Sequence, residues 1–234
     1  LHTACRRQRQ MCIRDRIHSH GQETFKDIYK VIYKSIERTV DLVFYPENED
    51  EVRELIELSS KFNICLIPYG GGTNVTRALS IPENENRMVV SVDMRRMSKI
   101  EWINSEDRRV CVQAGITGGE LIEVLKEKGF TIGHEPDSVE LSTVGGWVAT
   151  NASGMKKNRY GNIEDIVENI SLVSPKGVIK QINPISRGSI GFKPQNVLFG
   201  SEGNIGIITK VILKMHEIPH AQKYNSVIFK QWSD

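Results

Sequence analysis

The stretch ICLIPYGGGTN, residues 64–74, places an apolar strand directly before three consecutive glycines. Glycine adopts positive φ without steric cost and leaves no side chain in front of the backbone amides. Successive amides that point the same way form a concave anion site, and a pyrophosphate is a suitable occupant. Thr73 and Asn74 add polar side chains beside it. A plain glycine-rich turn is the alternative, because a GGGT sequence alone is not specific.

The glycine spacing disfavours the commonest nucleotide-binding folds. No strand is followed by the G-x-G-x-x-G run of a Rossmann fold, and no Walker A sequence is present. The run GSEGNIG, residues 200–206, also has the wrong spacing for the dinucleotide fingerprint. The sequence therefore argues against an ordinary NAD or ATP site.

Two further segments combine glycine with small polar residues. DSVELST, residues 137–143, continues into VGGWVATNASG, residues 144–154, and this pattern suits a loop against a flat polar ring and its phosphate tail. Val144 and Trp147 argue against an irregular surface loop, since such residues favour burial. GSEGNIGII, residues 200–208, leads a glycine-rich turn into a strand, where the backbone can approach a ligand closely.

Hydrophobic periodicity and turn residues predict an α+β domain with mixed sheets flanked by helices. Helices are expected over residues 22–36 and 49–62, and from a Thr117–Glu120 capping box to Gly129. Residues 133–163 show little periodicity and predict a long functional loop. We expect two α/β lobes in sequence order, with their boundary in this glycine-rich middle. The expected strands are residues 41–45, 64–69, 88–93, 100–103, 109–113, 166–173, 178–182 and 205–215.

Composition and charge indicate an ordinary globular protein. The 234 residues are 39% hydrophobic and 26% charged, and the net charge is +2. Residues 1–16 hold five arginines and one aspartate, so the rest of the chain is slightly acidic, which argues against nucleic acid as a partner. The basic run Cys5–Arg16 resembles a translated adapter more than a targeting or nucleic-acid-binding arm, and we expect residues 1–16 to be a non-native leader.

Neither a metal site nor a disulfide framework is expected. Cys65 and Cys111 stand alone in apolar, β-rich surroundings without CxxC spacing, so buried reduced thiols are the favoured interpretation. No set of His, Cys, Asp and Glu has the spacing of metal ligands.

A few polar residues near the middle segment allow two interpretations each. His134, followed by Glu135, precedes the segment, and a structural histidine is favoured over a catalytic one. Lys156, Lys157 and Arg159 either attract a substrate phosphate or form a solvated basic turn.

Three glycine-rich strand ends in one chain resemble the FAD enzymes built like vanillyl-alcohol oxidase and p-cresol methylhydroxylase (PCMH). Within that group the resemblance narrows to the alkyldihydroxyacetonephosphate synthases. It is carried by GHEPDSVELSTVGGWVATNASGMKKNRYGNIEDIVENI, residues 133–170, and by IPYGGGTNV, VQAGITGGEL and FGSEGNIGIIT. It implies a two-lobed PCMH-type FAD-binding domain over residues 39–219. A helical segment, 17–38, would precede this domain, and residues 220–234 would begin a truncated C-terminal cap domain.

The resemblance implies FAD as the cofactor. Residues 68–74 would hold its pyrophosphate, residues 137–143 and 150–153 the isoalloxazine and ribityl region, and residues 202–208 would complete the site. In relatives that attach FAD through the first loop, a histidine follows the glycines. Thr73 and Asn74 stand there instead, so we expect non-covalent FAD. The implied cofactor-binding residues are Pro68, Tyr69, Gly70, Gly71, Gly72, Thr73, Asn74, Asp137, Ser138, Val139, Glu140, Leu141, Ser142, Thr143, Thr150, Asn151, Ala152, Ser153, Glu202, Gly203, Asn204, Ile205, Gly206, Ile207 and Ile208.

The implied activity is the exchange of the acyl group of acyl-dihydroxyacetone phosphate for a long-chain fatty alcohol. This is the ether-forming step of ether phospholipid synthesis, and it involves no net redox change. The resemblance also implies a peroxisomal, membrane-associated homodimer whose catalytic residues lie in the C-terminal cap, so this chain alone is expected to be inactive. The alternative is an FAD-dependent 2-hydroxy-acid dehydrogenase of the D-lactate type, which has the same fold.

Overall fold

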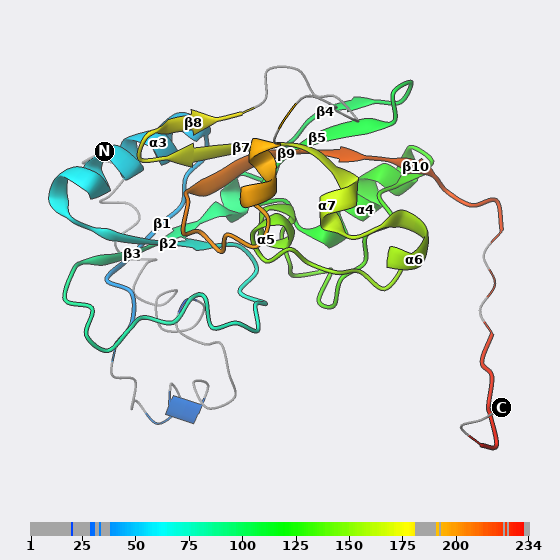
Figure 1. Cartoon of the computed structure of the whole chain (residues 1–234), viewed down its shortest axis with the longest axis horizontal. Helices are drawn as coiled ribbons and strands as arrows, with labels where there is room; N and C mark the ends of the chain where they lie inside the picture. Colours follow the sequence, from blue (N-terminus) through cyan, green and yellow to red (C-terminus); the bar gives the residue numbers. More distant parts are fainter. Residues whose placement is uncertain are drawn as a thin grey trace.

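The described part of the computed structural model has two larger β-sheets and a short two-stranded one, with helices packed against them (Figure 1). The structure describes residues 20, 29–30, 33, 38–180, 191, 193–221, 223 and 225–231. The leader expected at residues 1–16 lies outside the described residues, and so does most of the helix expected at residues 22–36. The domain boundaries drawn from the sequence stay predictions.

The smaller sheet is parallel and carries the first glycine-rich turn at its carboxyl edge. Its order is β1-β3-β2, from β1 (Leu42–Phe44), β2 (Cys65–Tyr69) and β3 (Val89–Asp93). Helix α3 (Glu49–Phe62) joins β1 to β2, and the Asn48 side chain caps it by accepting a hydrogen bond from the Glu51 amide. Tyr69 pairs with Asp93, so β2 and β3 end side by side where the chain enters the glycines.

The larger sheet is antiparallel and has the order β4-β5-β9-β7-β8. Helix α4 (Gly118–Glu127) begins at the expected capping box, in which the side chains of Thr117 and Glu120 each accept a hydrogen bond from the other's amide. β6 (Phe130–Thr131) and β10 (His216–Glu217) form a separate two-stranded ladder. The five strands of the larger sheet are β4 (Ile100–Asn104), β5 (Arg109–Gln113), β7 (Val167–Ser174), β8 (Gly177–Ile179) and β9 (Ile207–Lys214).

Residues 133–163 do not form one irregular loop, so that expectation is wrong. They contain α5 (Val144–Ala149) and α6 (Lys157–Tyr160), and α7 (Ile163–Ile166) follows at their end. These helices have six, four and four residues, which is too short for a 3.6-residue periodicity to show in the sequence. The Thr143 side chain caps α5 by accepting a hydrogen bond from the Gly146 amide at 3.2 Å. A 3-10 turn, η2 (Pro194–Val197), precedes the third glycine-rich segment.

The two lobes meet earlier in the chain than expected. The parallel sheet ends with β3 and the antiparallel sheet begins with β4, so the boundary falls at the 3-10 turn η1 (Met94–Arg96) and not in the glycine-rich middle. The middle glycines serve close packing instead: a Cβ on Gly145 would lie 2.7 Å from the Cβ of Ala114. The two-lobed α+β architecture itself is confirmed, with parallel and antiparallel pairing kept in separate sheets.

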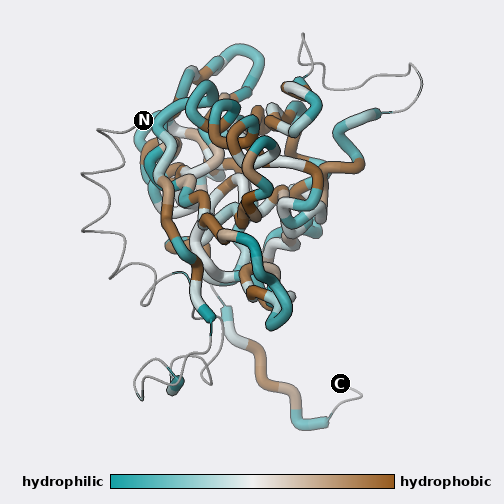
Figure 2. Tube along the Cα trace, turned by 90° about the vertical axis from the view of Figure 1, so that its left-hand side faces the viewer, coloured by the Kyte–Doolittle hydropathy of each residue, from teal (hydrophilic) through white to brown (hydrophobic). Residues whose placement is uncertain are grey.

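Buried apolar residues form three clusters among the described residues: one under the larger sheet, a second between the lobes, and a smaller third of Val40, Val43 and Val89 at the parallel sheet. In the first, Trp147 of α5 packs with Leu121 and Leu125 of α4, all buried. The second joins α3, β3, η1, β7 and β9, and Thr209 of β9 also donates a hydrogen bond to the Glu49 carboxylate at 2.7 Å. Figure 2 shows the apolar segments concentrated inside the body. These contacts hold the two lobes in a fixed relation.

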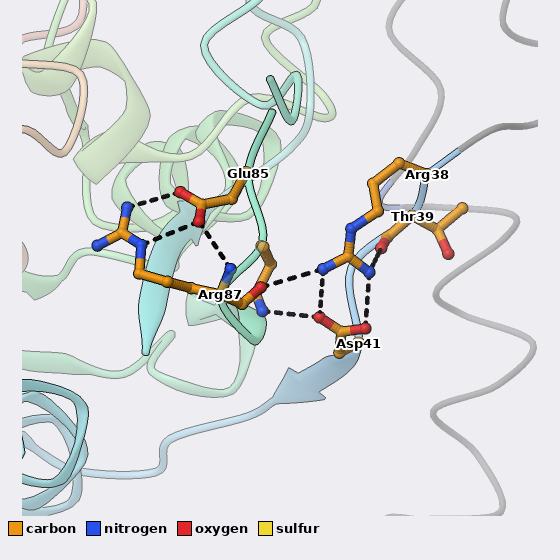
Figure 3. A network of polar contacts seen from close by, with 6 residues as sticks. Arg38, Thr39, Asp41, Glu85 and Arg87 are labelled. Atoms are coloured by element: carbon orange, nitrogen blue, oxygen red, sulfur yellow. Dashed lines mark hydrogen bonds and ion pairs between the residues drawn. The ribbon is translucent and has the colours of Figure 1, made fainter. Parts of the chain in front are cut away.

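An ion-pair network closes the amino edge of the parallel sheet (Figure 3). Arg38 binds both Asp41 carboxylate oxygens at 2.7 Å and donates to the Arg87 carbonyl at 3.2 Å. The Arg87 guanidinium in turn binds Glu85 and lowers the pKa of that carboxyl group to about 2. The loop that follows the glycines is therefore tied down at its far end, where it enters β3.

None of the described helices is long and apolar enough to cross a membrane. The last described residues leave the body as an extended tail (Figures 1 and 2), on which Val227, Ile228 and Phe229 are exposed.

Candidate functional site

The three glycine-rich segments come together around one cavity of about 70 Å³ between the lobes. The first segment contributes the end of β2 and the turn after it, the second contributes Thr143 and α5, and the third contributes the start of β9. The lining residues are Pro68, Tyr69, Gly70, Met94, Ala114, Thr143, Gly145, Gly146, Ala149, Gly203, Gly206, Ile207 and Ile208.

The glycines let these segments approach each other closely, because no Cβ stands between them. A Cβ on Gly70 would overlap the Thr143 hydroxyl, and a Cβ on Gly71 would overlap the Leu141 carbonyl oxygen. Gly203 has a φ of +84°, and a Cβ there would lie 2.8 Å from the Pro68 ring. Of the three consecutive glycines only Gly72 has positive φ, +68°, so tolerance of positive φ explains the need for Gly72 but not for Gly70 or Gly71. Gly71 is required because the backbone of the second segment lies directly against it.

The turn after β2 presents backbone amides without acceptors. No described residue accepts a hydrogen bond from the amides of Gly71, Gly72 or Thr73. The Asn74 side chain stabilises the turn by accepting a hydrogen bond from the Ala78 amide at 3.0 Å. Amides in this arrangement suit an anionic ligand, as the sequence predicts.

The second segment uses two of its polar side chains within the fold. Ser142 accepts a hydrogen bond from the Trp147 indole at 2.8 Å, and Thr143 caps α5 while also lining the cavity. Asp137, Ser138 and Leu141 are exposed, and Ser138 has a left-handed φ of 57°. The buried half of the segment therefore fixes the position of its exposed half.

Some predicted residues do not line the cavity. The Thr150 hydroxyl donates to the Gly146 carbonyl at 2.9 Å, and the Ser153 hydroxyl donates to Asn162 at 2.9 Å. Also outside the lining are Gly71, Gly72, Thr73 and Asn74 of the first segment, residues 137–142 and 151–152 of the second, and Glu202, Asn204 and Ile205 of the third.

Five lining residues were not predicted: Met94, Ala114, Gly145, Gly146 and Ala149. The Gly145–Gly146 pair was a usable signal, since adjacent glycines in a buried helix indicate a close approach of another backbone. Met94 carried no such signal, because only the packing of the two lobes brings it to the cavity.

His134 is buried next to α5. Its exposed fraction is 1%, and its ring lies edge-on to Trp147 with centroids 5.0 Å apart. Neither ring nitrogen has a hydrogen-bond partner among the described residues. Burial lowers the pKa of His134 to about 4, so the imidazole is neutral at pH 7. This packing favours the structural interpretation of His134.

The basic residues after the middle segment form a surface turn. Lys156 pairs with Glu135 at 2.5 Å, Arg159 lies over the Tyr160 ring at 5.5 Å, and Lys157 is exposed. Because Glu135 neutralises one of the three charges, the solvated turn is the better interpretation than a phosphate site.

A family model described as "FAD binding domain" matches residues 40–183. The chain belongs to this family. The FAD-binding domain is 45% identical over 210 residues to the alkyldihydroxyacetonephosphate synthase of Caenorhabditis elegans, an alignment that covers 90% of this chain and 35% of the relative. It is 31% identical to a mitochondrial D-lactate dehydrogenase [cytochrome] of Arabidopsis thaliana, over 76% of this chain and 31% of the relative.

A solved structure of alkyldihydroxyacetonephosphate synthase has the same fold, with a TM-score of 0.78 and 38% identity over 85% of this chain and 36% of that one. This FAD-binding domain spans about a third of the length of its curated synthase relatives.

The site fits the FAD of this family. It offers unpaired amides for a pyrophosphate at Gly71–Thr73, and five of the residues that line the cavity are glycines, which let a flat ring come close to the backbone. An FAD bound here would supply an isoalloxazine ring that can take up electrons from a substrate carbon. Within the described part of the chain, no three His, Cys, Asp or Glu side chains are grouped so that they could hold a metal ion.

Proposed function

We propose that the chain is the FAD-binding part of an ether-lipid synthase that exchanges the acyl group of acyl-dihydroxyacetone phosphate for a long-chain fatty alcohol. The observation that carries the proposal is the difference in similarity between the two kinds of relative. The synthase of Caenorhabditis elegans is 45% identical over 90% of the chain, whereas the Arabidopsis thaliana D-lactate dehydrogenase is 31% identical over 76%.

An FAD-dependent 2-hydroxy-acid dehydrogenase is the second candidate. The dehydrogenase relative supports it, and the two activities need the same cofactor and the same fold. They differ in the fate of the electrons, because a dehydrogenase passes them to an acceptor and the synthase reaction has no net redox change. An acceptor assay therefore separates them.

The test uses the full-length protein that contains this chain. One mixture holds D-lactate and an artificial electron acceptor, and the other holds acyl-dihydroxyacetone phosphate, a fatty alcohol and the same acceptor. We expect fatty acid release and an ether product in the second mixture, and no acceptor reduction in either. Rapid D-lactate-dependent reduction of the acceptor without ether product would establish the dehydrogenase instead.

Residues 68–74 are proposed to hold the pyrophosphate of FAD, residues 137–143 and 150–153 the ring and ribityl region, and residues 202–208 the remainder. We propose that attachment is non-covalent, because Thr73 and Asn74 follow the glycines where a covalent link through this loop needs a histidine. Acid precipitation of the loaded protein is expected to leave the yellow flavin in the supernatant. Colour that stays with the washed pellet would contradict this.

We also propose that the full-length protein is a peroxisomal homodimer, attached peripherally to a membrane. This proposal rests on the resemblance to the synthases. The exposed Val227, Ile228 and Phe229 of the tail support a second domain that begins there, since three adjacent apolar side chains on an extended segment favour burial against further chain.

A further inference from the structure

A buried carboxylate holds an arginine at the carboxyl edge of the parallel sheet. Asp93, the last residue of β3, has an exposed fraction of 0%. It accepts hydrogen bonds from Arg95 Nε at 2.9 Å and Arg95 Nη2 at 2.6 Å, and one from His20 Nε2 at 3.2 Å. A bidentate arginine–carboxylate contact fixes the direction of the guanidinium as well as its distance.

The fixed guanidinium lies against Tyr69, the residue that precedes the glycine turn. Arg95 Cζ is 5.4 Å from the Tyr69 ring centroid, within the range of a cation–π contact. The His20 ring packs against the same tyrosine, with centroids 3.8 Å apart. Tyr69 is 7% exposed and lines the cavity, so its ring is held firmly beside the candidate site.

Tyr69 in turn touches the glycine turn itself. A Cβ on Gly72 would lie 2.6 Å from the Tyr69 hydroxyl oxygen, so the tyrosine ring supports the turn at the residue with positive φ. Gly72 stands between Gly71 and Thr73, whose amides also lack acceptors among the described residues. A chain of contacts thus runs from Asp93 through Arg95 and Tyr69 to the amides of the turn.

The electrostatics keep this chain of contacts in place. Burial alone would raise the pKa of Asp93, but the hydrogen bonds from His20 and Arg95 outweigh it and lower that pKa. The carboxylate therefore stays ionised at neutral pH and keeps Arg95 bound. The Arg95 side chain is 45% exposed, so part of it faces solvent.

We propose that Arg95, fixed by Asp93, is a positioning residue for the pyrophosphate of the cofactor. It holds Tyr69 against Gly72 and so keeps the three amides of the turn aimed at the phosphates. The inference rests on the proposed function, in which residues 68–74 hold the pyrophosphate. Asp93 and Arg95, which lie outside the three glycine-rich segments, thereby join the residues that position the cofactor.

The neighbouring Arg96 offers a matched control. It stands on the same 3-10 turn, and its side chain is 43% exposed. It also makes an ion pair, with Glu47 at 3.4 Å, and a cation–π contact, with Tyr45 at 5.1 Å. Its partners lie just after β1 and not next to the glycine turn.

The experiment measures the dissociation constant for FAD and the melting temperature of the apoprotein, both on the full-length protein. We expect Arg95→Met to weaken FAD binding about tenfold, the size of one lost cation–π or charge-assisted contact, with little change in apoprotein melting. Arg95→Lys should restore part of the loss, since lysine keeps the charge but not the bidentate geometry. Arg96→Met should change neither quantity.

Asp93→Asn releases Arg95 and should weaken FAD binding by a similar factor. If the two residues act through one another, the double variant loses no more affinity than either single variant.

Two results would overturn the inference. One is FAD affinity in Arg95→Met within twofold of wild type. The other is a loss of affinity matched by a large fall in apoprotein melting temperature, which marks a general role in stability.

The variant Gly71→Ala distinguishes an error in the role of Arg95 from an error in the proposed cofactor site. If Gly71→Ala blocks FAD binding and Arg95→Met does not, only the role of Arg95 is lost. If neither variant affects FAD, the site itself is wrong.

Discussion

Replacing Gly71 with valine is expected to weaken FAD binding by about a hundredfold or more. A Cβ at this position overlaps the carbonyl oxygen of Leu141, and that oxygen belongs to the backbone of a segment pinned by the buried Ser142–Trp147 hydrogen bond. The clash can be relieved only by moving the glycine turn away from the second segment, which displaces the amides proposed to bind the pyrophosphate. Losing two charge-assisted hydrogen bonds, at about 1.5–3 kcal/mol each, weakens binding roughly a hundredfold or more.

The overlap begins at the Cβ, so Gly71→Ala should already show the effect. Titration of the full-length apoprotein with FAD, followed by flavin fluorescence, measures it. Gly119→Ala is the matched control, because a Cβ on Gly119 of α4 meets its nearest neighbour, the Glu140 Cα, at an ordinary 3.4 Å. Gly71→Ala protein that binds FAD as tightly as the Gly119→Ala protein would refute the assignment of the phosphates to this turn.

Gly71 is also an example of a residue whose structural role the sequence alone does not reveal. The three glycines after an apolar strand correctly predict a turn at the end of β2 with free amides. The sequence does not say why each glycine is needed, and positive φ proves to be the reason at Gly72 but not at Gly71. The close approach of Leu141 depends on two segments about 70 residues apart meeting in space, and no local pattern contains that information.

Local signals predicted the regular elements well. α3 occupies residues 49–62 as expected from its apolar face, and the Thr117–Glu120 capping box opens α4. Both depend on side chains within a few residues of each other. The lobe boundary and the lining residues Met94 and Ala114 were missed, because they depend on how the two sheets pack. The short helix α5 was missed because six residues are too few to show a period.

Low pH should destabilise the protein through His134. Its pKa is about 4 in the folded state, against about 6.5 in an unfolded chain, because burial disfavours the charged ring. The unfolded state therefore binds a proton below pH 6.5 that the folded state does not bind until about pH 4. Stability is unaffected by this group above pH 6.5 and falls as the pH drops from 6.5 to 4, by about 3 kcal/mol in total.

Urea unfolding of the apoprotein at pH 7 and pH 4 measures the effect. The variant His134→Phe keeps a flat ring against Trp147 and cannot titrate, so its loss of unfolding free energy between the two pH values should be about 3 kcal/mol smaller than that of wild type. His216, whose pKa burial also lowers, is present in both proteins and cancels in the comparison. His134→Asn checks that the change comes from removing the titration and not from the phenyl ring. An equal loss in wild type and both variants would show that His134 finds a hydrogen-bond partner in the folded state and titrates as it does in the unfolded chain.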